Sequence, residues 1–323
     1  MVVLRGAGVT LLTAGWGSGR LTAIGRGISI GLALLATIAA CGSGGGGSSS
    51  APPAPVQQHQ IDFGGQARAY RVFVPPTLDR SRPAPLVMVL HGGNNTVEDM
   101  VKTTLFDREA AAGEFIAAYP EGVGRAWNAG MCCGGAPRRG TDDVGFLTRV
   151  LDQMQVDYPI DTKRVFVAGV SNGAMMAYRF ACERADRVTA VGSVAGATRV
   201  VECQPSRPVS ILEIHGTADP LVPYEGGEPS AAEAQGALLY PSTPAMVQRW
   251  AEVDGCPAPA PAQVTGPVTI ESWAGCRGGS SVRLVTVQGG GHIWFASGLG
   301  PANGALDATS AIWRFFSELR PTG

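Results

Sequence analysis

The pentapeptide Gly-Val-Ser-Asn-Gly at residues 169–173 is the feature that most constrains how this chain can fold. An apolar, β-rich segment precedes it at 164–170, and a helix-forming segment follows at 174–182. A G-x-S-x-G motif between a strand and a helix is typical of a sharp turn that exposes a serine above a sheet. The glycines let the turn close where a Cβ would clash. This context predicts Ser171 as a nucleophile, with a helix N-terminus behind it that favours a developing anion.

Strand-forming runs alternate with helix-forming segments along most of the chain. Residues 58–63 and 67–74 alternate in polarity around Gly64-Gly65, which predicts an opening hairpin. Residues 85–90 are continuously apolar, as expected of a strand buried on both faces of a sheet. The alternation predicts an α/β fold with a doubly wound, mostly parallel sheet. Further strands are expected at 115–119, 188–194, 209–214, 268–273 and 281–287, and helices at 97–112, 143–156, 243–253 and 307–319.

A serine nucleophile in such a fold needs an acid and a base, which follow it in the order serine, acid, histidine. Of the four histidines, only His215 and His292 follow Ser171. His215 ends the apolar run 209–214, and Asp219 follows on the next loop, where the acid belongs. His292, in a glycine-rich loop, then remains as the base. We expect His292 to take the serine proton, and Asp219 to orient the imidazole and stabilise its cation.

An oxyanion formed at the nucleophile requires two N–H donors. One is expected from the backbone of Asn172, and the other from Gly92 or Gly93, in the turn after the third strand. We interpret the His91 side chain as a packed, hydrogen-bonded support of that turn. The remaining histidines are interpreted as a surface residue, His59, and a structural one, His215.

Four polar or aromatic side chains are expected at the rim of the substrate site. Trp127 and Asn128 lie in the loop 120–140, which we place near the active site. Tyr224 and Trp294 lie on the loops that carry the acid and the base. Instead of lining the rim, both side chains could be buried in the core.

The N-terminus has the pattern of an export signal. Arginines precede an apolar run of thirteen residues, 28–40, which suits a signal peptide better than a membrane span. The run ends in Ile-Ala-Ala-Cys41, which is similar to a bacterial lipobox. We expect a signal peptide at 1–40, a lipidated tether rich in Gly, Ser and Pro at 41–56, and one domain at 57–323. A lipid on Cys41 would hold the protein on the outer face of the cell membrane; a secreted protein is the alternative.

Six cysteines follow Cys41, and an even number in an exported chain predicts disulfides rather than metal ligands. Sequence neighbourhood favours the pairs Cys182–Cys203 and Cys256–Cys276. Cys132 and Cys133 are then either a vicinal pair or bonded to other cysteines. A catalytic thiol is disfavoured, because export oxidises thiols and the serine motif already supplies a nucleophile.

The net charge and the length of the chain limit the kinds of molecule that we expect the protein to bind. The net charge of −1 indicates no polyanion such as a nucleic acid. The roughly 270 residues after the N-terminal segment suit one domain with a large core. We expect a monomer whose contact with a membrane is made through the lipid alone.

Several motifs occur in order along residues 60–320: Leu-His-Gly-Gly at 90–93, Trp-Asn-Ala-Gly-Met-Cys-Cys-Gly at 127–134, Asp-Asp-Val-Gly-Phe at 142–146, Gly-Val-Ser-Asn-Gly-Ala-Met-Met at 169–176, His-Gly-Thr-Ala-Asp at 215–219 and Gly-His-Ile-Trp at 291–294. Together they resemble the secreted esterases that include LpqC-type lipoproteins, poly(3-hydroxybutyrate) depolymerases and feruloyl esterases. The resemblance implies an α/β-hydrolase that cleaves carboxylic esters of a polyester, hydroxycinnamate or other acyl group, with no cofactor. Many members have Ala or Gly in place of Asn172, and Thr-Trp-Pro where this chain has Ile-Trp-Phe at 293–295, so the wall of the acyl pocket is expected to differ.

Two other functional classes fit parts of the sequence. An acyltransferase of related fold would use the same residues but pass the acyl group to an alcohol instead of water. A non-catalytic surface lipoprotein could use the scaffold for binding, but the complete set of Ser171, Asp219 and His292 disfavours it.

Overall fold

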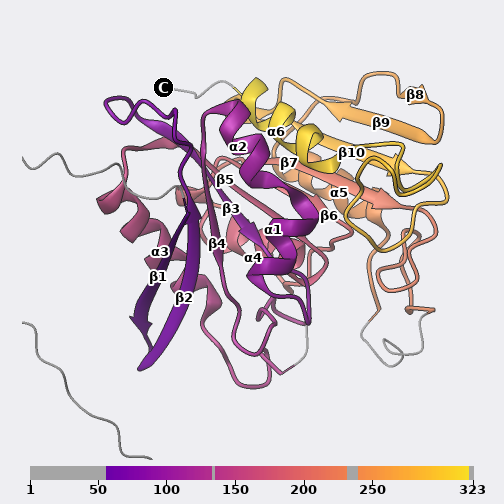
Figure 1. Ribbon diagram of the computed structural model, residues 1–323. Coiled ribbons are helices and arrows are strands. Elements are labelled where there is room, and N and C mark those ends of the chain that lie inside the picture. The colour runs from indigo at the N-terminus through magenta and orange to yellow at the C-terminus, as the bar shows by residue number, and fades with distance from the viewer. Residues whose placement is uncertain (1–55, 133–134, 231–238, 320–323) are drawn as a thin grey trace, which may run out of the picture. The chain divides into compact units, whose positions relative to one another are not determined.

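The computed structural model describes residues 56–132, 135–230 and 239–319, and Figure 1 shows their arrangement. The predicted signal peptide, Cys41, the tether up to residue 55 and Cys133 lie outside these ranges. All residues described below belong to one compact unit, residues 52–323. Within the described ranges, no helix combines the length and the apolar character needed to cross a membrane.

The strands of the described residues form one ten-stranded sheet in the order β1-β2-β4-β3-β5-β6-β7-β10-β9-β8. Its centre is parallel from β4 to β10. The parallel strands are β4 (Ile116–Pro120), β3 (Ala84–Leu90), β5 (Ile160–Val170), β6 (Ala190–Val194), β7 (Ser210–Gly216) and β10 (Val282–Val287). Antiparallel pairs complete both edges, with β1 (Val56–Phe63) and β2 (Gln66–Phe73) at one and β9 (Val268–Trp273) and β8 (Gln263–Thr265) at the other. The predicted mostly parallel sheet and opening hairpin are confirmed.

Helices cover both faces of the sheet, which explains why the central strands are apolar throughout. Every residue of β3 is buried, and successive residues face opposite sides. Leu86 and Met88 pack in the core on one face, whereas Val87 and Val89 pack in the core on the other. The first face is covered by α3 (Asp143–Asp157), α4 (Asn172–Glu183) and α5 (Thr243–Val253), and the second by α1 (Val97–Thr104), α2 (Phe106–Gly113) and α6 (Ala308–Glu318) (Figure 1).

The single helix expected at 97–112 is wrong, because the chain breaks there into α1 and α2. Leu105 adopts φ 55°, a left-handed conformation that ends α1 and begins α2. No glycine or proline marks this break. The turn places Phe106 in the core, where its ring meets Phe115 and Trp294 edge-on at 6.4 and 5.9 Å. Burial of this ring offsets the unfavourable backbone of Leu105.

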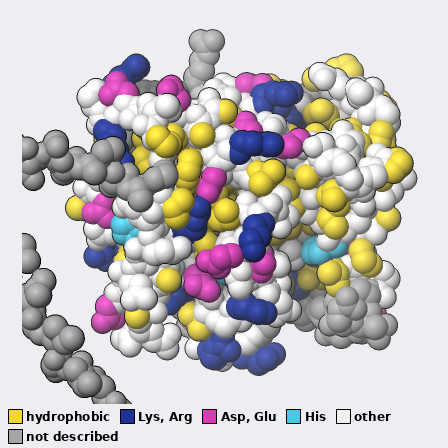
Figure 2. Space-filling model, in the orientation of Figure 1, with side chains coloured by type: hydrophobic (Ala, Val, Ile, Leu, Met, Phe, Trp, Pro, Cys, Tyr) yellow, Lys and Arg dark blue, Asp and Glu magenta, His cyan; other side chains and the backbone are white. Residues whose placement is uncertain are grey.

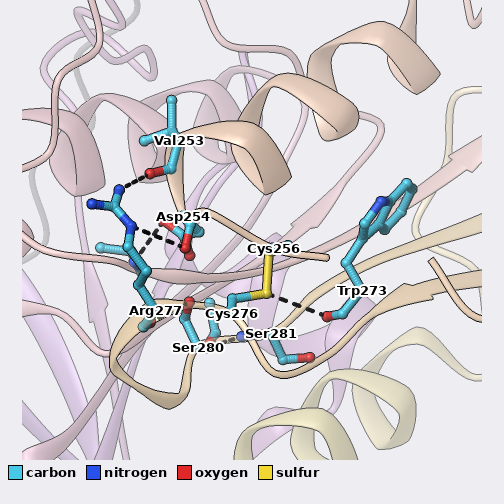
Figure 3. Close-up of a disulfide and its surroundings, with 10 residues drawn as sticks. Val253, Asp254, Cys256, Trp273, Cys276, Arg277, Ser280 and Ser281 are labelled. Carbon is cyan, nitrogen blue, oxygen red and sulfur yellow. Dashed lines mark hydrogen bonds between the residues drawn. A yellow bond between two sulfur atoms is a disulfide. The ribbon is translucent and has the colours of Figure 1, made fainter. Parts of the chain in front are cut away.

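Two disulfides join the predicted cysteine pairs. Cys182 at the end of α4 is bonded to Cys203, and Cys256 after α5 is bonded to Cys276 (Figure 3). Cys132 is also disulfide-bonded. Because Cys133 lies outside the described residues, the vicinal pairing stays a prediction.

The surface carries no segregated charge on the face shown in Figure 2. Acidic and basic side chains lie interspersed there among apolar ones. His59 is half-buried on β1, where its ring stacks on Tyr70 at 4.8 Å.

Candidate active site

Ser171 lies in the sharp turn between β5 and α4. Its backbone has φ 53° and ψ −122°, a conformation that side chains other than glycine rarely adopt. Both flanking glycines are required by close packing. A Cβ on Gly169 would lie 2.6 Å from the backbone of Gly173, and a Cβ on Gly173 would overlap the carbonyl oxygens of Leu90 and His91. The turn therefore fixes Ser171 at the N-terminus of α4.

Asp219 and His292 come together although they are 73 residues apart in the sequence. Asp219 Oδ2 lies 2.7 Å from Nδ1 of His292, and its Oδ1 accepts hydrogen bonds from the N–H groups of Leu221 and Val222, both at 2.8 Å. Burial of the carboxyl by itself raises its pKa, but the hydrogen bonds from His215 and His292 outweigh burial and hold the pKa of Asp219 well below its usual value. Asp219 is therefore an anion at neutral pH.

A cavity of about 420 Å³ is lined by both Ser171 and His292. Gly93 and Trp294 also line it. Its apolar wall is formed by Met100, Val170, Leu221, Ile293 and Leu299, and its polar part by Asn95, Asp99 and Thr103. The cavity thus offers an apolar group a place beside the serine. A second cavity, of about 440 Å³, is lined by residues between Thr198 and Val253, and none of the predicted catalytic residues lines it.

The two predicted oxyanion donors come from neighbouring segments. A Cβ built on Gly93 would lie 3.8 Å from Cβ of Asn172, so Gly93 lies close to the residue that follows Ser171 in the chain. Gly93 is exposed and lines the cavity, whereas Gly92 is buried and its carbonyl accepts from Asn95 N–H at 3.2 Å. Of the two glycines, only Gly93 lines the cavity that holds Ser171.

The Asn172 side chain has a structural task that the sequence did not suggest. Its Oδ1 accepts from the backbone N–H of Trp127 at 2.7 Å, and its Nδ2 donates to the carbonyl of Trp127 at 3.0 Å. His91 supports the same region, as predicted: it is fully buried, and its Nε2 accepts from Gly122 N–H at 2.9 Å. Burial lowers the pKa of His91, which keeps the ring neutral.

Three of the four predicted rim residues do not line the cavity. Trp127 is a wrong prediction, because its indole is fully buried and donates to the carbonyl of His91 at 2.9 Å. Asn128 instead holds its own loop, with Nδ2 donating to Thr141 O at 2.8 Å. The hydroxyl of Tyr224 is hydrogen-bonded to the hydroxyl of Thr286, with 2.7 Å between the two oxygens. Trp294 alone lines the cavity; it is 4 % exposed, and its N–H donates to the Thr309 hydroxyl at 3.1 Å.

Comparisons with known proteins agree with this fold and chemistry. A family model described as phospholipase/carboxylesterase matches residues 145–238. The chain is 29 % identical to "Putative esterase NocK" of Nocardia uniformis, over 83 % of this chain and 89 % of that protein. It is 30 % identical to "Feruloyl esterase B" of Piromyces equi over 68 % of this chain, and spans only 42 % of that relative's length.

Solved structures show the same fold at low sequence identity. An acetyl xylan esterase from Aspergillus awamori matches 81 % of this chain and 99 % of its own, with a TM-score of 0.55 and 17 % identity. A ferulic acid esterase from Anaeromyces mucronatus, in complex with ferulic acid, matches 82 % of this chain and 90 % of its own, with a TM-score of 0.52 and 16 % identity. These structures confirm the predicted α/β-hydrolase fold, and the family model and the esterase relatives confirm the prediction of a carboxylic ester hydrolase.

Proposed function

We propose that this protein is an exported serine esterase in which Ser171 is the nucleophile, His292 the base and Asp219 the acid. The observation that carries the proposal is the 2.7 Å hydrogen bond between Asp219 and His292, beside a cavity that His292 and Ser171 line together. The position of Ser171 in a turn between a strand and a helix supports the same assignment.

The protonation of His292 follows from its partner. An ionised carboxylate can only accept, so Nδ1 of His292 carries the proton and Nε2 is free to take the proton of Ser171. The serine oxygen then attacks the ester carbonyl. The N–H groups of Gly93 and Asn172 stabilise the oxyanion, and His292 returns the proton to the leaving alcohol. Water repeats the sequence on the acyl-enzyme and releases the acid.

The substrate class is proposed from the cavity wall and from the relatives. Apolar side chains beside Ser171, among them Met100 and Ile293, favour an apolar or aromatic acyl group. Relatives are named feruloyl esterase and acetylxylan esterase. We therefore place hydroxycinnamoyl and acetyl esters of polysaccharides ahead of polyesters of the hydroxybutyrate type.

Export and anchoring complete the proposal. The disulfides Cys182–Cys203 and Cys256–Cys276 fit an oxidising compartment. The lipobox-like segment ending at Cys41 supports acylation there and attachment to the outer face of the cell membrane.

Labelling and a substrate panel test the proposal. A fluorophosphonate should label the wild type and the control Ser81→Ala, which removes an exposed serine, but not Ser171→Ala. Hydrolysis of methyl ferulate, acetylated xylan and poly(3-hydroxybutyrate) film should be compared, with and without added alcohol. Release of ferulate or acetate supports the proposed class, preferred film hydrolysis contradicts it, and ester formation with the alcohol indicates an acyltransferase. Label on Ser171→Ala would overturn the nucleophile assignment.

A further inference from the structure

A second histidine shares the carboxylate of Asp219. His215 is fully buried near the end of β7, and its Nε2 lies 3.3 Å from Asp219 Oδ2. The same oxygen faces Nδ1 of His292 at 2.7 Å. On the other side of the ring, Nδ1 of His215 lies 2.9 Å from Oε1 of Glu213, which is also fully buried. His215 therefore stands between two buried carboxylates, one of which belongs to the proposed triad.

The acceptors around His215 require a proton on each ring nitrogen. Nε2 lies 2.8 Å from the carbonyl of Val222, which can only accept, and Nδ1 faces the Glu213 carboxylate. Burial by itself lowers the pKa of this imidazole, but the hydrogen bonds to Asp219 and Glu213 outweigh it and raise the pKa of His215 to about 10. The ring is then an imidazolium throughout the range in which an esterase is assayed.

No other charged side chain contacts the ring among the described residues. From α4, the hydroxyl of Tyr178 donates to Oε2 of Glu213 at 2.8 Å. From the start of α5, the Thr243 hydroxyl lies 3.3 Å from Nδ1 of His215. The ring of Tyr224 meets His215 edge-on at 6.0 Å. The charges thus alternate in one row: Glu213 negative, His215 positive, Asp219 negative, then His292.

We propose that His215 is a positioning residue that holds Asp219 in place and, as a cation between two buried carboxylates, takes part of the negative charge of Asp219 away from His292. The inference rests on the proposed function of Asp219 and His292. A second cation on the same oxygen opposes the protonation of His292, because like charges repel in a buried site. The enzyme therefore keeps its activity to lower pH than it would without the positive charge of His215.

The test separates the charge of His215 from its hydrogen bonds. In His215→Gln the amide can still donate toward Val222 and Asp219, but the cation is lost. Because this change leaves Glu213 buried without its partner, the double variant Glu213→Gln/His215→Gln removes both charges and protects folding. Tyr178→Phe is the matched control, since it removes a hydrogen bond to Glu213 but no charge. For each protein, kcat/KM is measured from pH 4.5 to 9 on a soluble ester, with folding checked by circular dichroism.

The acid limb of the kcat/KM profile should move upward by about one pH unit in His215→Gln. It should move upward by less in the double variant, which also loses the negative charge of Glu213, while the control keeps the wild-type limb. At alkaline pH both variants should retain far more activity than His292→Asn. If kcat/KM fell equally at every pH and the acid limb did not move, His215 would have only a packing role, which would overturn the proposal. A profile identical to that of the wild type would overturn it as well. A wild type with no esterase activity would overturn the proposed function itself. An active wild type whose variants show no shift would overturn only the role proposed for His215.

Discussion

Asp254 is a buried carboxyl whose charge should weaken the fold at neutral pH. It caps the C-terminus of α5 and is fully buried; Oδ1 accepts from Val209 N–H at a long 3.4 Å, and Oδ2 has no partner among the described residues. Arg277 lies close by, but its guanidinium donates to the backbone carbonyls of Val253 and Asp254 and not to the carboxylate (Figure 3). Burial therefore dominates and raises the pKa of Asp254 from 3.8 to about 6.

The sign of the pH effect follows from the raised pKa. Well below pH 3.8 the group is protonated in both the folded and the unfolded chain, and the fold bears no penalty. Between about pH 3.8 and 6 the unfolded chain releases this proton while the folded protein keeps it, so the free energy of unfolding falls across this range and is level again above about pH 6. At about 1.4 kcal/mol per unit of pKa, a shift from 3.8 to about 6 lowers the free energy of unfolding by up to about 3 kcal/mol at pH 7.5.

Asp254→Asn removes this ionisation and should flatten the pH dependence. Urea unfolding, followed by tryptophan fluorescence with the disulfides intact, gives the free energy of unfolding of wild type and variant between pH 4 and 7.5. The variant should gain up to about 3 kcal/mol on wild type over this range, whereas Asp62→Asn, the same change at an exposed position, should follow wild type. Parallel curves for wild type and Asp254→Asn would refute the reasoning.

Four further outcomes are expected. Ser171→Ala should lose on the order of 10⁴-fold or more in kcat, measured by single-turnover ester hydrolysis, while its circular dichroism stays that of wild type; substantial turnover would contradict the nucleophile assignment. Gly173→Ala should both destabilise the domain, by about 1–3 kcal/mol in urea, and reduce kcat/KM, because its Cβ overlaps the turn that holds Gly93; wild-type values for both would contradict the packing argument. Replacing both Cys256 and Cys276 by Ser should cost about 3 kcal/mol in urea unfolding, the chain-entropy value for a separation of 20 residues, and an unchanged midpoint would argue against it. Labelled palmitate should enter the wild type but not Cys41→Ser in whole cells, and equal incorporation would leave Cys41 without the proposed lipid.

The fold and the order of the proposed triad could be predicted because their signals are local in sequence. Apolar runs such as 85–90 identify buried strands, Gly64-Gly65 identifies a hairpin, and the glycines around Ser171 identify a strand-to-helix turn. The chain order of serine, acid and base then selects Asp219 and His292, whose side chains the structure brings together.

The remaining features depend on contacts between distant segments. The break at Leu105 is set by the burial of Phe106 against Phe115 and Trp294, which no turn residue announces. Trp127 was predicted at the rim because it lies in a loop, but its indole N–H donates to the carbonyl of His91. A glutamate inside the apolar run 209–214 was the available signal for the buried row of charges. It became informative only when the fold placed Glu213 beside His215.

The backbone conformation of Ser171 lowers folding stability at the position proposed for the nucleophile. A residue with a Cβ held at φ 53° and ψ −122° costs the fold of order 1–3 kcal/mol, and this strain is relieved only by glycine. Ser171→Ala and Ser171→Gly both lack the hydroxyl, but only the glycine variant relaxes the turn. The domain should therefore resist unfolding better with glycine at this position than with its own serine. Stability alone would favour glycine here, and the proposed role of Ser171 as the nucleophile gives a chemical reason for a serine in this strained conformation.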